Sequence, residues 1–371
     1  MQYDIESVAS NFMSAGRLIE AAPFGSGHIN DTFTLRCQTD AGEKSYILQR
    51  INHQVFRNPA AMMENIRRVT THIRGKLRDQ AEDLAQRQLI VIETNDGAAC
   101  LEDKHGNFWR LYNRIEKAVT YDTLESPQTA YEVARMFGWF QQMLIDLPGP
   151  PLHETIPDFH ATPKRLKNFQ EVLQRDPCNR AKDAPAEIDF VLENAGICDV
   201  LLKLVGEGEI SIRIAHNDAK INNVMLDSGT HKGVCVIDLD TVMPGLSLYD
   251  FGDMVRTATS PAEEDECNLS KVAMQMSRFE MLAKGYAEET HTFLTPAERK
   301  YLTFSARLIT FEQMIRFLAD YLAGDIYYKV SREGHNLDRS RTQMKLVQSI
   351  IEQEEAMNGV VERVFRQIDA P

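Results

Sequence analysis

The spacing of apolar residues differs between the first part of the chain and the rest. In the first part, apolar and polar residues alternate over short runs such as residues 32–35, which is the pattern of a half-buried strand. A short helix is predicted at residues 4–20. We predict two strands separated by a glycine loop within 23–35, and further strands at 45–51, 89–93 and 107–115.

Longer segments carry apolar residues at the spacing of a helix. The stripe from Met62 to Ile73 recurs every three or four residues, which predicts a helix with one buried face. The same spacing, with proline or glycine as terminators, predicts helices at 59–78, 128–147, 163–174, 185–204, 297–323 and 352–366. Strands followed mainly by helices predict an α+β fold with two lobes that meet near residue 117.

Composition limits the kind of protein that this chain can be. Its 371 residues suffice for two lobes, and its formal charge of -13 argues against a nucleic-acid binder, which needs a basic surface. We find neither an apolar run of roughly 20 residues, which a membrane span needs, nor the pattern of a signal peptide at the start. The six cysteines are scattered, as reduced thiols are in a cytoplasmic protein, and cytoplasmic is the location that we predict.

The most informative stretch is residues 214–226, together with the apolar run that ends at Asp238. It places Asp218 two residues after His216, and Asn223 five residues after Asp218. This is the spacing of a kinase catalytic loop, which a separate metal-binding aspartate follows. A lone aspartate beside a strand is more often a turn former or cap, but the combination predicts phosphoryl transfer. We predict that Asp218 is the catalytic base and that Asn223 and Asp238 are Mg²⁺ ligands.

Near the N-terminus, Gly25, Ser26 and Gly27 could cover the phosphates of a nucleotide, because backbone N–H groups approach closely where side chains are absent. An ordinary hairpin turn would show the same residues. In the next strand, Gln49 and Arg50 occupy the place where a kinase has its phosphate-binding lysine. Arg50 is therefore a candidate phosphate contact, or else a solvated strand residue.

Two further acidic residues need an assignment. Asp250 belongs to an Asp-Phe-Gly sequence but opens a predicted helix, so we interpret it as an N-cap or a buried brace for the catalytic loop rather than as a metal ligand. Glu64 in the helix 59–78 could brace a phosphate-binding lysine. Since no such lysine is evident, a surface carboxylate is an equally good interpretation.

The helix 297–323 carries Glu312, Arg316 and Asp320 at every fourth position. This spacing allows an ion-pair ladder along the helix surface. Alternatively, these side chains grip the hydroxyl groups of a polar substrate, with Tyr327 and Tyr328 as a platform for a sugar ring.

Taken together, these segments resemble the aminoglycoside phosphotransferase/choline kinase superfamily, and within it the branch of the N-acetylhexosamine 1-kinases. The resemblance rests on residues 216–227 and 236–253, which carry the catalytic motifs, and on 25–32, 46–52 and 316–328. It implies a protein-kinase-like bilobal fold. A small antiparallel-sheet lobe, residues 1–116, would bind the nucleotide, and a larger, mostly helical lobe, residues 117–371, would carry the catalytic and sugar-binding residues.

The resemblance also implies a reaction. ATP would donate its γ-phosphate to the anomeric hydroxyl of N-acetylglucosamine or N-acetylgalactosamine, with Mg²⁺ as cofactor. Thr241, Arg316 and Tyr327 would contact the sugar, and the chain would be a monomer or a weak homodimer. Two alternatives stay open: a related kinase for an aminoglycoside, choline, homoserine or methylthioribose, and a nucleotide-binding pseudokinase, which the missing lysine would suit.

Overall fold

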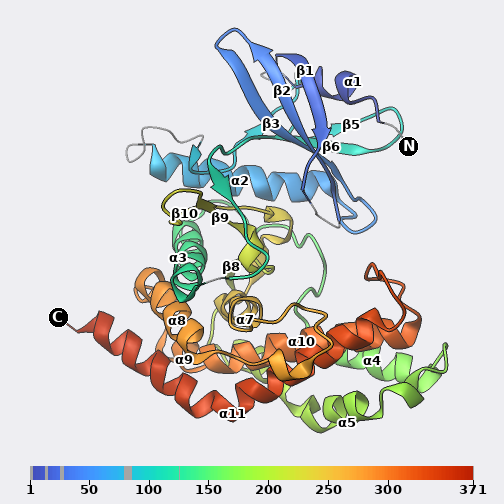
Figure 1. The fold of residues 1–371 in the computed structure, drawn as a ribbon. Coiled ribbons are helices and arrows are strands. Elements are labelled where there is room, and N and C mark those ends of the chain that lie inside the picture. Colours follow the sequence, from blue (N-terminus) through green and yellow to red (C-terminus); the bar gives the residue numbers. More distant parts are fainter. Residues whose placement is uncertain (1–2, 13–15, 26–28, 79–85, 125, 371) are drawn as a thin grey trace.

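An antiparallel sheet of six strands forms the N-terminal lobe, with one long helix beside it (Figure 1). The computed structural model describes residues 3–12, 16–25, 29–78, 86–124 and 126–370. The strand order is β1-β2-β3-β6-β4, and β5 pairs with β6. The elements are α1 (Ile5–Ala9), β1 (Arg17–Pro23), β2 (Asp31–Thr39), β3 (Gly42–Ile51), α2 (Pro59–Leu77), β4 (Val91–Ile92), β5 (Leu101–Glu102) and β6 (Phe108–Asn113).

Side chains that alternate along β2 and β3 form the core of this lobe. Leu35 and Cys37 on β2 and Leu48 on β3 are fully buried, and they pack with Trp109 and Leu111 on β6. The alternation places one face of each strand in the core and leaves the other face free to carry polar groups. The strands predicted at 45–51 and 107–115 and the strand after the glycine loop are confirmed, whereas the strand before the loop, β1, ends at Pro23, where the predicted strand begins.

The helix predicted at residues 4–20 is wrong beyond its first turns. α1 is capped by Asp4 and ends at Ala9, and residues 17–20 belong to β1, which pairs with β2. Gly16 has a φ of 70°, which is not helical, and a Cβ there would lie 2.2 Å from the backbone oxygen of Gln38, so this backbone requires glycine. Pairing with β2 therefore overrides the local pattern. Residues 13–15 lie outside the described part of the chain.

Helices dominate the C-terminal lobe, and a few short strands lie on its side nearest the sheet (Figure 1). The strands are β7 (Ala118–Val119), β8 (Arg213–Ala215), β9 (Val224–Asp227), β10 (Gly233–Val236) and β11 (Met243–Gly245). The helices are α3 (Pro127–Leu144), α4 (Thr162–Arg175), α5 (Pro185–Asn194), α6 (Val200–Gly206), α7 (Ser247–Ala258), α8 (Met276–Thr290), α9 (Pro296–Lys300), α10 (Leu302–Ala323) and α11 (His335–Asp369). Among the described residues, the 3₁₀ turns include η2 (Ala181–Asp183), η3 (Ala195–Ile197), η4 (Ile221–Asn223), η5 (Leu239–Thr241) and η6 (Leu269–Lys271).

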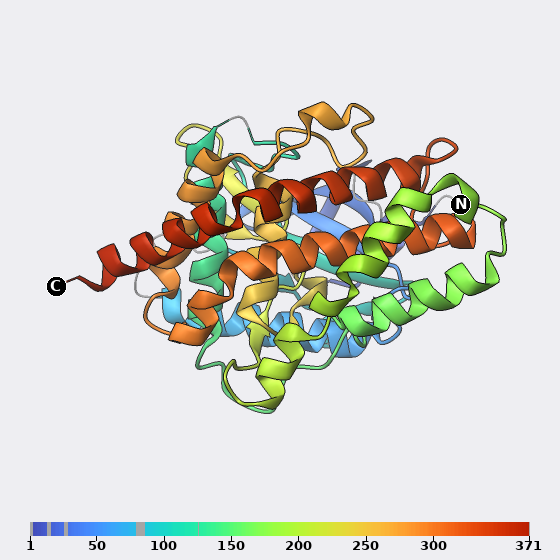
Figure 2. The ribbon, with the colours of Figure 1, turned by 90° about the horizontal axis from the view of Figure 1, so that it is seen from below.

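The long helices α10 and α11 run side by side across the underside of the molecule, next to α4 and α5 (Figure 2). Above them α7 packs closely against α10, since a Cβ at Gly252 would lie 2.5 Å from the backbone oxygen of Ser305. Two predicted helices are interrupted: 185–204 contains η3, and 297–323 breaks at Tyr301. The closing helix is longer than predicted, because it begins at His335. No helix of the described residues is long and apolar enough to span a membrane.

Contacts from α2 join the two lobes. The side chain of Asn65 donates to the backbone oxygens of His153 (2.8 Å) and Val242 (3.1 Å), and it is fully buried. The residues around the expected boundary at 117 lead from β6 to β7, which pairs with β9. The fold is therefore α+β, with an antiparallel sheet in the N-terminal lobe and helices in the C-terminal lobe.

Candidate active site

Asp218 lies in the loop between β8 and η4, and this loop is braced by Asp250 on α7. Asp250 is 0% exposed, and its oxygens accept hydrogen bonds from the backbone N–H groups of Asn217 (2.7 Å) and His216 (2.9 Å). The side chain of Gln141 on α3 donates a third bond at 2.6 Å. Because Asp250 lies within the helix and not at its N-cap, it is a buried brace for the loop, which is one of the two roles predicted for it.

His216 and Asn217 fasten the same loop through their side chains. His216 Nε2 lies 2.9 Å from the backbone oxygen of Ile237, and the buried ring packs edge-on against Phe137. Asn217 has a left-handed backbone with φ 63°, and its amide donates to the backbone oxygen of Thr241 at 3.0 Å. Asparagine tolerates this backbone better than most other residues do. These contacts fasten the loop to Ile237 directly after β10, to η5 and to α3.

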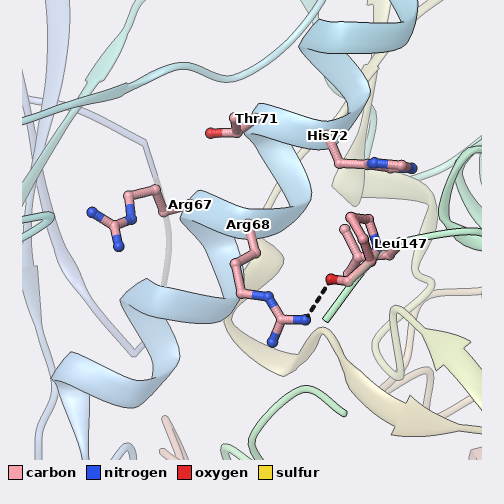
Figure 3. A pocket seen from close by; sticks show the side chains of 6 residues that line it. Arg67, Arg68, Thr71, His72 and Leu147 are labelled. Atoms are coloured by element: carbon pink, nitrogen blue, oxygen red, sulfur yellow. Dashed lines mark hydrogen bonds between the residues drawn. The ribbon is translucent and has the colours of Figure 1, made fainter. Parts of the chain in front are cut away.

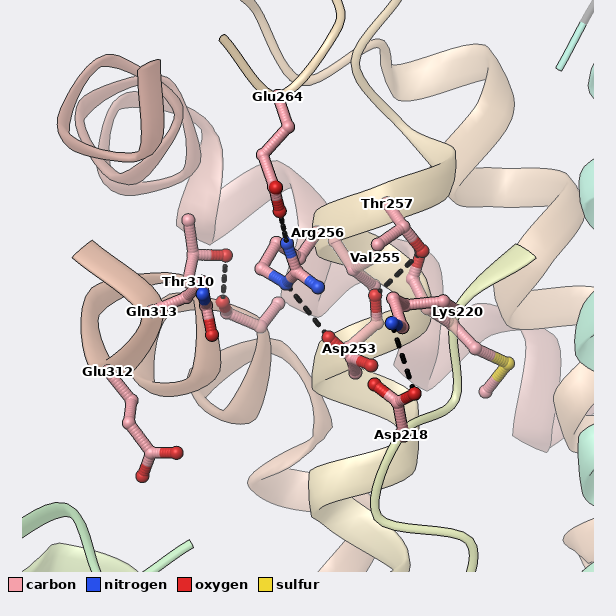
Figure 4. A network of polar contacts seen from close by, with 12 residues as sticks. Asp218, Lys220, Asp253, Val255, Arg256, Thr257, Glu264, Thr310, Glu312 and Gln313 are labelled. Atoms are coloured by element: carbon pink, nitrogen blue, oxygen red, sulfur yellow. Dashed lines mark hydrogen bonds and ion pairs between the residues drawn. The ribbon is translucent and has the colours of Figure 1, made fainter. Parts of the chain in front are cut away.

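Lys220 forms an ion pair with Asp218, with Nζ 3.0 Å from Oδ2 (Figure 4). Burial alone would raise the pKa of Asp218, but the charges of Lys220 and His216 hold that pKa below its ordinary value. The pKa of Lys220 is raised, chiefly by Asp218. Asp218 is therefore an ionised carboxylate of fixed orientation. The sequence interpretation did not include Lys220, although its place two residues after Asp218 was a usable signal.

Asn223 and Asp238, the predicted Mg²⁺ ligands, lie next to each other and to Asp218. The Asn223 amide nitrogen donates to the backbone oxygen of Asp218 (2.8 Å) and to its Oδ2 (3.2 Å). The backbone N–H of Ile237 donates to the backbone oxygen of Asn223 at 2.9 Å, which places Asp238 beside it. Asp238 has a left-handed backbone with φ 58°, as Asn217 does.

The free oxygens of this pair fit a magnesium ion. Within the described residues, no group donates a hydrogen bond to the Asp238 carboxylate, which is open to solvent, and both amide contacts of Asn223 use its nitrogen. Partial desolvation and the charges of Asp240 and Asp218 raise the pKa of Asp238 to about 6, and a bound cation would oppose this shift. The part of the chain that the structure describes has no cluster of three or more His, Cys, Asp or Glu for a metal. Mg²⁺ is commonly held by one or two protein groups together with phosphate oxygens.

Next to Lys220 lies a row of side chains of alternating charge, two of which are on α7. Asp253 faces Lys220, and Arg256 Nε donates to Asp253 at 2.8 Å (Figure 4). The other end of Arg256 donates to Glu264 at 3.0 Å. The negative charge of Asp253 thus adds to that of Asp218 around Lys220. The sequence interpretation missed this row, because Asp253 and Arg256 show only helical spacing.

Arg316 and Arg165 bring two guanidinium groups to the region beyond Asp218. Arg316 on α10 lies within electrostatic reach of Asp218, and it stacks 5.3 Å from the Phe159 ring and 5.8 Å from the Tyr328 ring. Burial and the charge of Arg316 lower the pKa of Arg165 on α4. Among the described residues no carboxylate forms an ion pair with either arginine, and Arg165 Nε is buried without a hydrogen-bond partner. The sequence interpretation did not include Arg165.

The neighbours of Arg316 on α10 have partners of their own. Glu312 is 1% exposed and accepts hydrogen bonds from Thr162 (2.6 Å) and from His160, whose Nδ1 lies 2.8 Å away. The carboxylate of Asp320 accepts three backbone N–H groups, those of residues 326, 327 and 328. The ladder suggested by the sequence spacing is therefore wrong: Glu312 and Asp320 have partners in other segments, and Arg316 forms no ion pair with a carboxylate among the described residues.

The three predicted sugar contacts come from two elements. Thr241 is buried on η5, and its Oγ1 has no hydrogen-bond partner among the described residues. Tyr327, in the segment that Asp320 holds, is 61% exposed, and its ring packs edge-on against Tyr328. The structure brings Tyr327 and Arg316 together, whereas no hydrogen bond or ring contact of the described residues links Thr241 to them. The sugar-binding roles stay predictions.

On the N-terminal side, Gly25 has a φ of 77° and open space at the Cβ position. Ser26 and Gly27 lie outside the described residues. Arg50 forms an ion pair with Asp31 at 2.6 Å, and its guanidinium lies 5.3 Å from the Tyr3 ring centroid. Arg50 thus has a carboxylate partner within its own lobe, and its contact with phosphate stays a prediction.

A buried ion pair between the lobes was not predicted. Arg110 on β6 and Asp240 on η5 have side chains that are 1% and 3% exposed, and they form two hydrogen bonds with each other. Arg110 Nε also donates to Gln49 at 2.9 Å. An arginine inside the otherwise apolar run of β6 was a signal that the sequence offered.

One hollow of the surface lies away from these residues. It has a volume of about 300 Å³ and is lined by residues of α2 and of the segment after α3, among them Arg68 and Leu147 (Figure 3). Arg68 donates to the backbone oxygens of Pro148 (3.0 Å) and Pro150 (2.7 Å), so it fastens α2 to the C-terminal lobe. Glu64 on the same helix pairs with His153 at the surface, as its alternative interpretation predicted.

Comparisons with known proteins agree with this geometry. The family model described as "Phosphotransferase enzyme family" matches residues 20–281. A spectinomycin phosphotransferase in complex with ADP and spectinomycin is similar to this chain, with a TM-score of 0.56, 12% identity, and coverage of 97% of this chain and 96% of that one.

Two further solved structures share the fold. A microcompartment-associated aminopropanol kinase has a TM-score of 0.54 and 15% identity, with coverage of 96% of this chain and 98% of that one. A choline kinase from Cryptosporidium parvum Iowa II has a TM-score of 0.54 and 12% identity, with coverage of 93% of each chain.

Proposed function

Because the chain belongs to the phosphotransferase enzyme family, we propose that it transfers the γ-phosphate of ATP to the anomeric hydroxyl of N-acetylglucosamine or N-acetylgalactosamine. The observation that carries the proposal is the ionised Asp218, held by Lys220 beside Asn223 and Asp238. ADP in the spectinomycin phosphotransferase of the same fold supports ATP as the donor.

The proposed step is an in-line displacement at the γ-phosphorus. The C1 oxygen of the sugar forms the new bond to phosphorus, the bond to the bridging oxygen of ADP breaks, and the proton of the hydroxyl passes to Asp218. The anomeric hydroxyl is more acidic than an ordinary alcohol, so the main task of Asp218 is to orient it. The charge of Lys220 compensates for the negative charge of the transferring phosphoryl group near Asp218.

Asn223 Oδ1 and the Asp238 carboxylate are the groups that would hold Mg²⁺. When bound, the ion neutralises charge on the phosphates of the nucleotide. Asn217 and Asp250 hold the loop that leads to Asn223, and His216 ties this loop to Ile237, the residue before Asp238.

The charge around Arg316 supports a neutral acceptor. Arg165 and Arg316 lie close together without carboxylate partners in the described part of the chain, beside the aromatic rings of Phe159, Tyr327 and Tyr328. A cationic group at roughly 5 Å from one guanidinium would be repelled by about 3 kcal/mol at an effective dielectric constant of about 20. Hydroxyl groups and an acetyl carbonyl, in contrast, accept hydrogen bonds from guanidinium, and a sugar ring stacks on aromatic faces.

This charge argues against a closely related alternative. The neighbours that share the fold include a choline kinase and an aminopropanol kinase, whose names give small cationic acceptors. Such acceptors would need a carboxylate free to pair with them. Around Arg316 the nearby carboxylates of Glu312 and Asp320 are buried and occupied by His160 and by backbone N–H groups.

The test is a comparison of neutral and cationic acceptors. N-acetylglucosamine and N-acetylgalactosamine are compared with glucosamine, choline and kanamycin, with ADP release as the measurement. We expect kcat/KM for protonated glucosamine to be at least about tenfold below that for N-acetylglucosamine. In Arg165→Gln this difference should narrow. A wild-type preference for choline or kanamycin would overturn the acceptor and leave the phosphoryl-transfer residues in place.

A further inference from the structure

The N-terminal lobe of a kinase normally presents a lysine to the nucleotide phosphates, and a glutamate from the neighbouring helix pairs with it. Here the corresponding strand carries Gln49 and Arg50. Glu64 on α2 is at the surface with His153, and Arg50 pairs with Asp31. The usual ion pair between a strand lysine and a helix glutamate is therefore not formed by these residues.

Arg110 supplies a guanidinium at that position from the next strand. In the pairing of β3 with β6, Gln49 lies directly opposite Arg110, so both side chains are on the same face of the sheet. Gln49 Oε1 accepts the Nε–H of Arg110 at 2.9 Å, while its amide nitrogen donates to Thr32 on β2 at 3.0 Å. Gln49, which is neutral, thus orients the guanidinium of Arg110.

The counter-ion of Arg110 comes from the other lobe. Asp240 on η5 accepts hydrogen bonds from both terminal nitrogens of Arg110, from Nη2 at 3.0 Å. On α2, the residue that faces Arg110 is Met63, whose sulfur lies 3.9 Å from Nη1. Arg110 therefore forms an ion pair across the lobe junction, and the helix residue beside it is a methionine, not a glutamate.

Two described residues near predicted triphosphate-binding elements lie close to this ion pair. Asn30, three residues after the Gly25–Gly27 segment, donates to Asp240 at 2.8 Å. Asp238, the candidate metal ligand, lies two residues before Asp240 and within electrostatic reach of Arg110. In addition, one N–H of Arg110 Nη2 has no acceptor among the described residues, because that nitrogen donates only to Asp240.

We propose that Arg110, oriented by Gln49 and paired with Asp240 across the lobe junction, is the cation that binds the nucleotide phosphates in place of the usual lysine. The proposal rests on ATP being the phosphoryl donor. It assigns to Arg110 the contact that the sequence assigned to Arg50. Because Asp240 lies two residues after Asp238, the same ion pair would hold the guanidinium of Arg110 near the carboxylate of Asp238, the candidate metal ligand.

The experiment compares the binding of ATP and adenosine in the presence of Mg²⁺, by calorimetry, for the wild type and for Arg110→Met. Loss of a phosphate contact should weaken ATP binding by roughly 10- to 100-fold, since a charge-assisted hydrogen bond contributes about 1.5–3 kcal/mol, and should change adenosine binding by less than about threefold. Arg36→Met is the matched control, because Arg36 also pairs with carboxylates, but its partners lie in its own lobe and its side chain is 47% exposed. Equal losses for ATP and adenosine, or no loss, would overturn the proposal.

Two further variants separate the possible causes. Arg110→Met leaves Asp240 buried and unpaired, so the double variant Arg110→Met/Asp240→Leu removes both charges and should recover stability without recovering the ATP preference. Recovery of that preference would show that the stranded carboxylate, not the missing guanidinium, caused the loss, and would overturn the proposal. A loss in Arg50→Gln but not in Arg110→Met would return the role to Arg50. A wild type that binds ATP no better than adenosine would refute the donor itself.

Discussion

Replacing Asp250 with Asn tests whether the catalytic loop is held by a buried carboxylate. The side chain keeps its shape, but one oxygen that accepts hydrogen bonds becomes an N–H₂ donor. In the better orientation, the amide oxygen keeps the bonds from His216 and Gln141, and the amide nitrogen faces the backbone N–H of Asn217. A buried backbone N–H without an acceptor costs about 1–3 kcal/mol, and each of the two retained bonds loses about 1 kcal/mol with the charge.

These contributions sum to about 3–5 kcal/mol of the free energy of unfolding. Burial raises the pKa of Asp250, although the charge of His216 opposes this shift. Burial therefore makes the carboxylate less favourable, so its replacement by a neutral amide costs less, and we expect the variant to lose about 3 kcal/mol of the free energy of unfolding. Since Asn217 adjoins Asp218, the loop should also shift. A displacement of about 1 Å would lower kcat by on the order of 100-fold.

Urea unfolding, followed by tryptophan fluorescence and circular dichroism, measures the first effect, and ADP release measures the second. Asp227→Asn is the matched control, because Asp227 also accepts two backbone N–H groups, those of Gly229 (3.0 Å) and Thr230 (2.7 Å), but at an exposed turn. The control should behave like the wild type. If Asp250→Asn unfolds at the same urea concentration as the control and keeps its kcat, the bracing role is refuted.

Three further predictions concern side chains around the same loop. Asp218→Asn should lower kcat by at least about 1,000-fold and leave ATP binding intact by calorimetry, because the orienting carboxylate is lost but no nucleotide contact is; unchanged kcat would contradict the assignment. Lys220→Met should lower kcat by roughly 100-fold with little change in the KM of the sugar, and a change confined to KM would place Lys220 in acceptor binding instead. His160→Gln should destabilise the protein most near pH 5–6, by roughly 3 kcal/mol, and less above pH 8. Burial opposes protonation of His160, but the charge of Glu312 outweighs it and raises the pKa of His160. The stabilisation by the ion pair is therefore complete below the ordinary histidine pKa of about 6.5 and is lost as pH rises through the raised pKa. A difference in urea unfolding between wild type and variant that does not depend on pH would refute the ion pair.

The local patterns that the sequence carries most strongly were predicted correctly. Alternation marked β2, composition marked β3, and helical spacing marked α2 and α3, because these signals are local to each segment. The segment 17–20 was assigned to the wrong element, since its strand conformation depends on pairing with β2. The spacing of Asp218, Asn223 and Asp238 was sufficient to place them together, because a short loop and a strand ending leave little freedom between them.

Contacts between distant segments could not be predicted in the same way. Arg110 and Asp240 are 130 positions apart, and Glu312 and His160 are 152 apart, so no local period relates them. The regular spacing of Glu312, Arg316 and Asp320 even suggested a wrong pairing, because the buried carboxylates found partners in other segments. In each case a buried charged side chain without a partner in its own segment pairs with a group from a distant segment. Only the folded structure shows which distant group lies near enough.

Identification of the product tests the central claim most directly. The wild-type protein is incubated with Mg²⁺, ATP and N-acetylglucosamine, and the product is examined by phosphorus NMR, with Asp218→Asn as the parallel sample. We predict a phosphate signal coupled to the anomeric proton, accompanied by one ADP for each sugar phosphate, and no such signal in the variant on the same time scale. A phosphate on another hydroxyl, or equal product from Asp218→Asn, would contradict this account.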